Sequence, residues 1–96
     1  MNAENALPAT AIVSLAHGVR IRHDSVRDHT VLLAPERTIA LDPIAVAILE
    51  TLYGVRDIDA VSSHLAEIYS APVDQIRNDV AAFLTEMHNR RFVEVS

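Results

Sequence analysis

The sequence predicts an α+β fold of the winged helix-turn-helix type, in which a three-stranded antiparallel sheet is followed by a three-helix cluster. Three observations support this fold class. Apolar and polar residues alternate over much of residues 18–42, which is the pattern of half-buried strands. From residue 43 onward, apolar residues recur every three or four positions, which is the pattern of helices. The connections are short, and 96 residues fit a single domain.

The expected strands lie in residues 18–42. "GVRIRHD" (18–24) alternates, and "SVRD" (25–28) is a turn because such residues bond their own backbone. "HTVLLA" (29–34) is apolar enough to be the central strand of a small sheet. Pro35 to Arg37 turn the chain, and "TIALD" (38–42) gives a third strand, so the three strands form an antiparallel meander.

Three helices are expected after the sheet. Asp42 is an N-cap with Pro43 at the first helical position, and Gly54 supplies the C-terminal stop. Asp57 caps a second helix, which is interrupted at residues 70–72. A third helix runs over residues 72–91, and "FVEV" (92–95) closes the chain as a short extended segment. The second and third helices have the helix-turn-helix arrangement.

Residues 1–16 show no sustained periodicity, so we expect a flexible N-terminal tail before a domain over residues 17–96. The N-terminus lacks the basic start and apolar run of a secretory signal, and no stretch reaches the roughly 18–20 apolar residues that span a bilayer. The sequence therefore predicts a cytoplasmic protein with no membrane partner.

No catalytic, metal or cofactor site is expected. There is no cysteine, and two glycines cannot build a phosphate-binding loop. No serine lies in a nucleophile elbow. The five histidines lack the spacing of metal-ligand pairs on strands or helices: His17, His23, His29, His64 and His88. These absences favour a binding protein over an enzyme.

DNA binding is the alternative that the helix-turn-helix pattern raises. The formal net charge is −5, and the third helix carries three arginines against three acids over residues 72–91. Phosphate contacts supply most of the affinity for nucleic acid, so this charge disfavours nucleic acid as a partner.

The outer strand of the meander, residues 38–42, leaves backbone N–H and C=O groups unpaired, which is a template for another extended chain. If the third helix lies alongside, a peptide could add there as a strand. Two flanks of that helix remain open as its wall: Arg77, Ala81, Leu84 and His88, or Asp79, Glu86 and Arg90. A second copy of the chain could also pair with this edge, which would give a homodimer.

The chain resembles the pyrroloquinoline quinone (PQQ) synthesis protein D family, PqqD, over roughly residues 14–95, and residues 18–58 and 79–93 carry the resemblance. The resemblance rests on the "LLAPER" turn, the helix that ends in Gly54-Val55-Arg56, and the Asp79-Val80 and Phe83-Leu84 pattern. It implies a peptide chaperone, without catalytic activity, for the ribosomal precursor peptide of PQQ. The chaperone would present this peptide to a radical S-adenosylmethionine (SAM) enzyme that cross-links a Glu and a Tyr within it.

By analogy with related peptide-modifying systems, the resemblance implies a peptide strand beside the third strand and against the third helix. The implied binding residues are Arg37, Thr38, Ile39, Ala40, Leu41, Ile76, Arg77, Val80, Ala81 and Leu84. Two positions depart from the family pattern. Tyr53 stands where Asp is common, which leaves open a sister pathway of the mycofactocin type, and Arg91 stands where Gly is common, so the end of the third helix is expected to differ.

Overall fold

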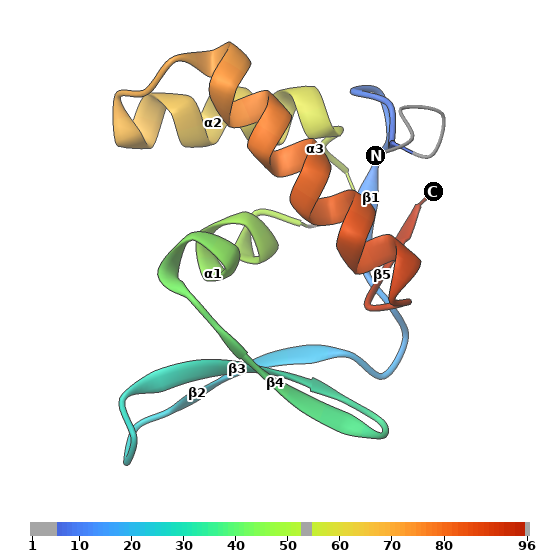
Figure 1. The fold of residues 1–96 in the computed structure, drawn as a ribbon, viewed down its shortest axis with the longest axis vertical. Helices are drawn as coiled ribbons and strands as arrows, with labels where there is room; N and C mark the ends of the chain where they lie inside the picture. Colours follow the sequence, from blue (N-terminus) through green and yellow to red (C-terminus); the bar gives the residue numbers. More distant parts are fainter. Residues whose placement is uncertain (1–5, 53–54, 96) are drawn as a thin grey trace.

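The computed structural model of the 96-residue chain describes residues 6–52 and 55–95. Figure 1 shows a sheet below a helical cluster. The elements follow in the order β1 (Val13–Leu15), β2 (Arg20–Asp24), β3 (His29–Ala34), β4 (Arg37–Leu41), α1 (Pro43–Glu50), α2 (Ile58–Tyr69), α3 (Val73–Asn89) and β5 (Val93–Val95). The predicted three-stranded antiparallel meander and the three following helices are confirmed.

The three-stranded sheet has the order β2-β3-β4, so β3 is central and β4 is an edge strand. Leu32 of β3 lies opposite both Ile21 of β2 and Ile39 of β4. Leu32 has no exposed surface, so the face that these three residues share is the one turned to the core. The turn between β2 and β3 is held by Asp24, whose Oδ1 accepts from the N–H groups of Val26 (3.0 Å) and Arg27 (3.2 Å).

Aspartate caps begin the first two helices, as the sequence predicts. Oδ1 of Asp42 accepts from the Ala45 N–H (2.7 Å), and Oδ1 of Asp57 accepts from the Ala60 N–H (2.8 Å). The expected stop at Gly54 lies outside the described residues. Instead, α1 ends at Glu50, with Thr51 as its C-cap.

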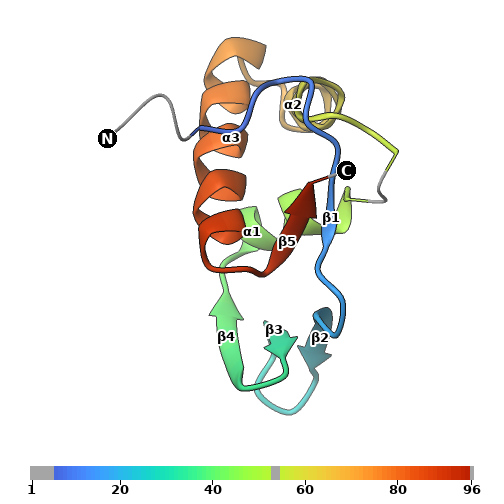
Figure 2. The ribbon, with the colours of Figure 1, turned by 90° about the vertical axis from the view of Figure 1, so that its right-hand side faces the viewer.

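The expectation of a free tail over residues 1–16 is wrong for residues 6–16. Here β1 pairs with β5, and the Ala11 carbonyl oxygen accepts from the Ile58 N–H (2.9 Å). Ala11 and Val13 are buried, because small apolar side chains fill the space beside α2 and β5. Figure 2 shows this segment crossing α3 before it descends as β1 beside β5. Residues 1–5 lie outside the described part of the chain.

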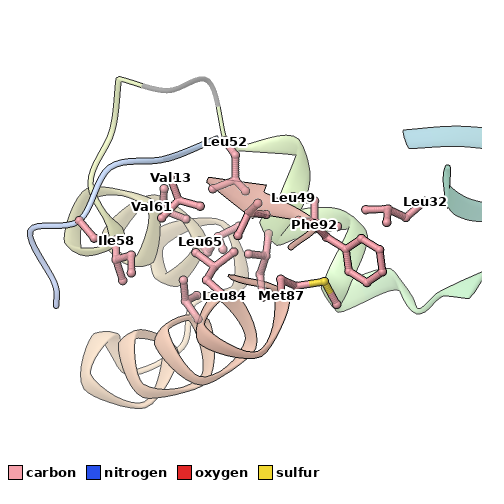
Figure 3. Close-up of a cluster of buried hydrophobic side chains, with 14 residues drawn as sticks. Val13, Leu32, Leu49, Leu52, Ile58, Val61, Leu65, Leu84, Met87 and Phe92 are labelled. Carbon is pink, nitrogen blue, oxygen red and sulfur yellow. The ribbon is translucent and has the colours of Figure 1, made fainter. Parts of the chain in front are cut away.

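One hydrophobic core joins the helices to the sheet (Figure 3). Leu84 of α3 and Leu49 of α1 are almost completely buried, together with Ile58 and Val61 of α2. Leu32 extends this core into the sheet, next to Phe92 in the view of Figure 3. Because the core fixes the sheet and α3 in one unit, it also fixes where the edge of β4 lies relative to α3.

Candidate functional site

The edge of β4 is the first part of the site. Ile39 and Leu41 are half-buried and turn toward the core, whereas Thr38 and Ala40 are exposed. The two-residue turn at 35–36 pairs Ala34 with Arg37, which directs the backbone groups of Arg37 toward β3. Since these groups alternate along an antiparallel strand, Thr38 and Ala40 direct theirs outward, away from β3. A second extended chain would find these groups available.

A row of residues along α3 is the second part. Ile76, Asp79, Val80 and Phe83 recur at three- to four-residue spacing, and Arg90 follows Phe83 by seven residues, or about two turns, so the five follow one side of the helix. Two hollows lie at the two ends of this row.

The first hollow, which we call the apolar hollow, measures about 150 Å³ and lies at the N-terminal end of α3. Ile76, Asp79 and Val80 contribute from α3, and Asp79 is the one charged residue among those that line it. The other lining residues come from α1 and α2: Ile44, Ala47, Ile48, Leu65 and Tyr69. Ile44, at the start of α1, is 68% exposed, so apolar surface surrounds the entrance as well.

The second hollow, the arginine hollow, lies at the C-terminal end of α3, against the turn between β3 and β4. Arg37, Arg90 and Phe92 line it, and the centre of each guanidinium lies over the Phe92 ring, at 5.5 Å for Arg37 and 5.1 Å for Arg90 from its centroid. His17, Val19, Ala34, Pro35, Glu36 and Arg91 complete the lining. This contact brings the first residue of β4 close to the end of α3.

β4 and the α3 row therefore run in opposite directions. The start of β4 meets the end of α3 at the arginine hollow, and the residues after β4 meet the start of α3 at the apolar hollow. Figure 1 shows the same opposite courses. Five strand residues span about 17 Å and the row from Ile76 to Arg90 about 21 Å, so the two borders match in length. We call β4 with the α3 row the β4–α3 site.

The ten residues that the family resemblance implied fall on three separate parts of the structure. Residues 37–41 form the β4 edge, and Ile76 and Val80 line the apolar hollow. The other three lie elsewhere on α3. Leu84 has no exposed surface, and Arg77 binds Asp59 of α2 and Asp74 (2.8 and 2.9 Å).

Hydrogen bonds to Asp59 first, then to Asp74, raise the pKa of the Arg77 guanidinium above its ordinary value. Arg77 is therefore committed to the α2 side of α3. Ala81 lies on that side too, because its carbonyl oxygen accepts from the Thr85 hydroxyl, which in turn accepts from the Leu7 N–H (3.1 Å). The N-terminal segment and α2 thus cover this flank, whereas on the other flank Asp79 lines the apolar hollow and Arg90 lines the arginine hollow.

Sequence reasoning did not place Phe83, Ile44 or Ala47 in the site. Phe83 has core spacing, yet it is only half-buried, and it lies in the α3 row between the two hollows. Ile44 and Ala47 belong to the apolar stripe of α1, where they look like ordinary core residues. A sequence signal did exist for Asp79 and Arg90, because both belong to one of the two flanks left open.

The replacement of glycine by Arg91 was expected to change the end of α3. The structure instead keeps a left-handed turn at this position. Arg91 has φ of 67°, the Phe92 N–H donates to the Met87 carbonyl (2.9 Å), and the Arg91 N–H donates to the His88 carbonyl (3.0 Å). These are the two hydrogen bonds of a Schellman motif, with Arg91 in the position that usually holds glycine. The burial of Phe92 against Met87 stabilises this turn despite the side chain of Arg91.

Within residues 6–52 and 55–95, no group of three or more His, Cys, Asp or Glu side chains could hold a metal ion. In the same part of the chain, no helix has the length and apolar character to cross a bilayer.

The fold and the site define a small winged-helix domain with an open strand edge opposite a partly apolar helix face. The family described as coenzyme PQQ synthesis protein D (PqqD) matches residues 29–93, and the chain belongs to this family. It is 46% identical over 89 residues to a PqqA binding protein of Rhizobium meliloti, covering 93% of this chain and 91% of the relative. A PqqA binding protein of Xanthomonas euvesicatoria is 38% identical over 82 residues, covering 85% of this chain and 89% of the relative.

Two solved structures have the same fold. The solution NMR structure of the PqqD truncation of Methylobacterium extorquens PqqCD, described as a stand-alone recognition element for ribosomally synthesized and post-translationally modified peptides, superimposes with a TM-score of 0.82 at 34% identity. The match covers 97% of this chain and 99% of that one. The crystal structure of PqqD from Xanthomonas campestris matches with a TM-score of 0.57 at 33% identity, over 96% and 97% of the chains.

Proposed function

We propose that this protein is a peptide chaperone of PQQ biosynthesis. It would bind the ribosomal precursor peptide, PqqA, as an added strand on β4 and present it to the radical SAM enzyme that cross-links a Glu and a Tyr within it. The observation that carries this proposal is the exposed edge of β4 opposite the α3 row, in a family whose relatives are named PqqA binding proteins.

Strand addition would use the outward backbone groups of Thr38 and Ala40. Such hydrogen bonds contribute about 0.5–1.5 kcal/mol each and do not depend on the side chains of the peptide. They would hold a backbone of any sequence in the space between β4 and α3. Selection among peptides therefore has to come from side chains on the two borders.

The apolar hollow is suited to select one side chain of the peptide. A closed apolar cavity of about 150 Å³ in another protein takes up benzene, so this hollow can hold an aromatic or branched side chain. Alternate residues of an added strand point to the same side. Those that point toward α3 would meet Ile76 and Phe83, and those that point away would stay in solvent, where a modifying enzyme could reach them.

A carrier of this kind needs moderate affinity, because its cargo has to be released to the next enzyme. A disordered peptide loses about 1–2 kcal/mol of conformational free energy for each backbone residue that becomes ordered. This loss offsets much of the free energy gained from pairing. We therefore expect a Kd near the micromolar range, which corresponds to a binding free energy of about −8 kcal/mol. The protein would act by binding and positioning, without chemistry of its own.

An amide NMR titration of the 15N-labelled protein tests this function. We expect synthetic PqqA of Rhizobium meliloti to shift the amides of residues 37–42 and the α3 row, and a DNA duplex to shift neither. Salt-sensitive shifts with DNA alone would overturn the proposal in favour of a winged-helix DNA-binding protein. Concentration-dependent shifts at 38–41 without peptide, which PqqA does not displace, would instead show that a second copy occupies the edge.

A further inference from the structure

The arginine hollow gathers positive charge at one end of the β4–α3 site. Arg37, Arg90 and Arg91 line it with His17, and Glu36 is the one acidic residue of the lining. The whole chain carries a formal charge of −5, so a concentration of three guanidinium groups is unusual for this protein. It lies where a peptide on β4 would pass the first residue of the strand.

These arginines have no carboxylate partner among the described residues. The ion pairs within that part of the chain join His23 to Asp28 and Arg77 to Asp59 and Asp74. Glu36 is next to Arg37 in sequence and Glu86 precedes Arg90 by one turn, but neither comes within 4.0 Å of a guanidinium. Arg77 shows that an arginine of this protein with an acid in reach does pair with it.

The Phe92 ring holds two of these side chains in place. Phe92 is buried, with 3% of its surface exposed, and the Arg37 and Arg90 guanidinium centres lie 5.5 and 5.1 Å from its centroid. Cation–π contact of this kind restricts the flexible arginine side chains before a ligand arrives. It also keeps two like charges close to one ring, an arrangement that a bound anion would stabilise.

The favourable position of cations at a helix C-terminus accounts for part of this cluster. It accounts neither for Arg37, which belongs to the sheet, nor for the conformation of Arg91. A left-handed backbone is strained for a non-glycine residue, and glycine would avoid that strain. An arginine there keeps a third cation at the hollow at the expense of stability.

We propose that Arg37 and Arg90, assisted by Arg91, bind a carboxylate of the peptide that lies along β4. The carboxylate would come from an acidic side chain or from the C-terminus of the peptide, and its capture would set the register of the added strand. Guanidinium groups bind carboxylates through paired N–H donors, which gives geometric selection as well as affinity. This inference rests on the proposed function, because it requires a peptide on β4.

The position of the carboxylate would also report the direction of the peptide. Since β4 starts at the arginine hollow, an antiparallel peptide strand would end there, and the acidic group would follow the paired segment. In a parallel arrangement the acidic group would precede the paired segment. The place of the carboxylate in the peptide sequence, after or before the paired segment, therefore shows whether the peptide runs antiparallel or parallel to β4.

The test measures the affinity of Rhizobium meliloti PqqA for the wild type, for the double variant Arg37→Gln with Arg90→Gln, and for a matched control. The control is Arg20→Gln with Arg22→Gln, which removes the same charge from exposed positions on β2. Isothermal titration calorimetry at low and high salt gives Kd, and circular dichroism confirms that each variant is folded. A second arm replaces each acidic residue of the peptide by its amide, and the C-terminal carboxylate by an amide.

We expect the Arg37/Arg90 variant to bind at least about tenfold more weakly and to lose most of its salt dependence, while the control binds like the wild type. One neutralised peptide should lose a similar factor with the wild type and almost nothing further with the variant. The inference would be overturned if the variant and the control lost the same affinity. It would also be overturned if every neutralised peptide lost as much affinity for the Arg37/Arg90 variant as for the wild type. In that case wild-type binding of PqqA would leave the proposed function standing, whereas no binding at all would remove both.

Discussion

A proline substitution in β4 can separate the two roles that the backbone of this strand would have. Ala40 is exposed and directs its N–H away from β3, whereas Ile39 is half-buried opposite Leu32 and directs its N–H into the sheet. Proline has no N–H, so Ala40→Pro removes a donor from the peptide and Ile39→Pro removes one from the sheet. Ala40→Pro should therefore weaken peptide binding and leave folding intact, whereas Ile39→Pro should lower the free energy of unfolding.

The magnitudes follow from what each position contacts. Ala40→Pro loses no buried side chain, and the lost hydrogen bond accounts for about 0.5–1.5 kcal/mol of peptide binding. The proline ring also occupies space that a strand about 4.8 Å away would need, so we expect Kd to rise at least tenfold. Ile39→Pro leaves the carbonyl of the buried Leu32 without its donor and loses a half-buried side chain, which together cost about 2–5 kcal/mol of folding free energy.

Urea denaturation gives the free energy of unfolding of each variant, and calorimetry gives Kd for PqqA. Ala40→Thr keeps the N–H and favours strand geometry, so it should bind PqqA like the wild type and serves as the control. A folded Ala40→Pro protein with unchanged Kd would refute strand addition on β4. If instead Ala40→Pro unfolds the domain and Ile39→Pro does not, the N–H of Ala40 points into the sheet and that of Ile39 points outward.

Three further changes test the packing of α3 and its ends. Arg91→Gly should raise the free energy of unfolding by about 0.5–1 kcal/mol, seen as a Tm higher by roughly 3–6 °C, because glycine accepts φ of 67° without strain; a lower Tm would show that the arginine itself stabilises the turn. Leu84→Ala should cost about 2–5 kcal/mol in urea denaturation, since Leu84 is fully buried, and a cost below 1 kcal/mol would contradict its place in the core. Phe83→Ala should weaken PqqA binding more than Arg77→Gln does, because Phe83 belongs to the α3 row and Arg77 pairs with acids on the other flank; the reverse order would move the site to that flank.

Local signals made most of the fold predictable. The change from a period of two to a helical period occurs at Asp42 and Pro43, where the structure has its N-cap and first helical residue. The strand predicted over 29–34 coincides with β3. The pairing of β1 with β5 was not predictable in this way, because β1 has three residues and its partner lies about 80 positions later in the chain. Strands this short carry too little alternation to identify, and nothing local indicates a distant partner.

The sequence predicts the parts of the site whose neighbours are close in the chain, and it does not predict the parts that depend on distant neighbours. The edge position of β4 follows from its being last in a meander. The hydrophobic stripe of α3 shows which side is buried, but it does not show what covers each flank. That information depends on Leu7 reaching Thr85 and on Asp59 reaching Arg77, and both contacts join residues that are distant in sequence. Phe83 has the spacing of this stripe, so the sequence alone does not distinguish it from a core residue.

The free energies involved indicate why the two hollows matter more than the strand edge between them. Thr38 and Ala40 each direct one N–H and one C=O outward, which yields about 2–6 kcal/mol for four hydrogen bonds. Ordering five peptide residues costs about 5–10 kcal/mol, so pairing alone leaves no net affinity. Micromolar binding requires about 8 kcal/mol in total, and that surplus has to come from side chains at the apolar and arginine hollows. A peptide with an apolar group and a carboxylate at the right separation would bind, whereas other extended chains would leave the exposed edge of β4 unoccupied.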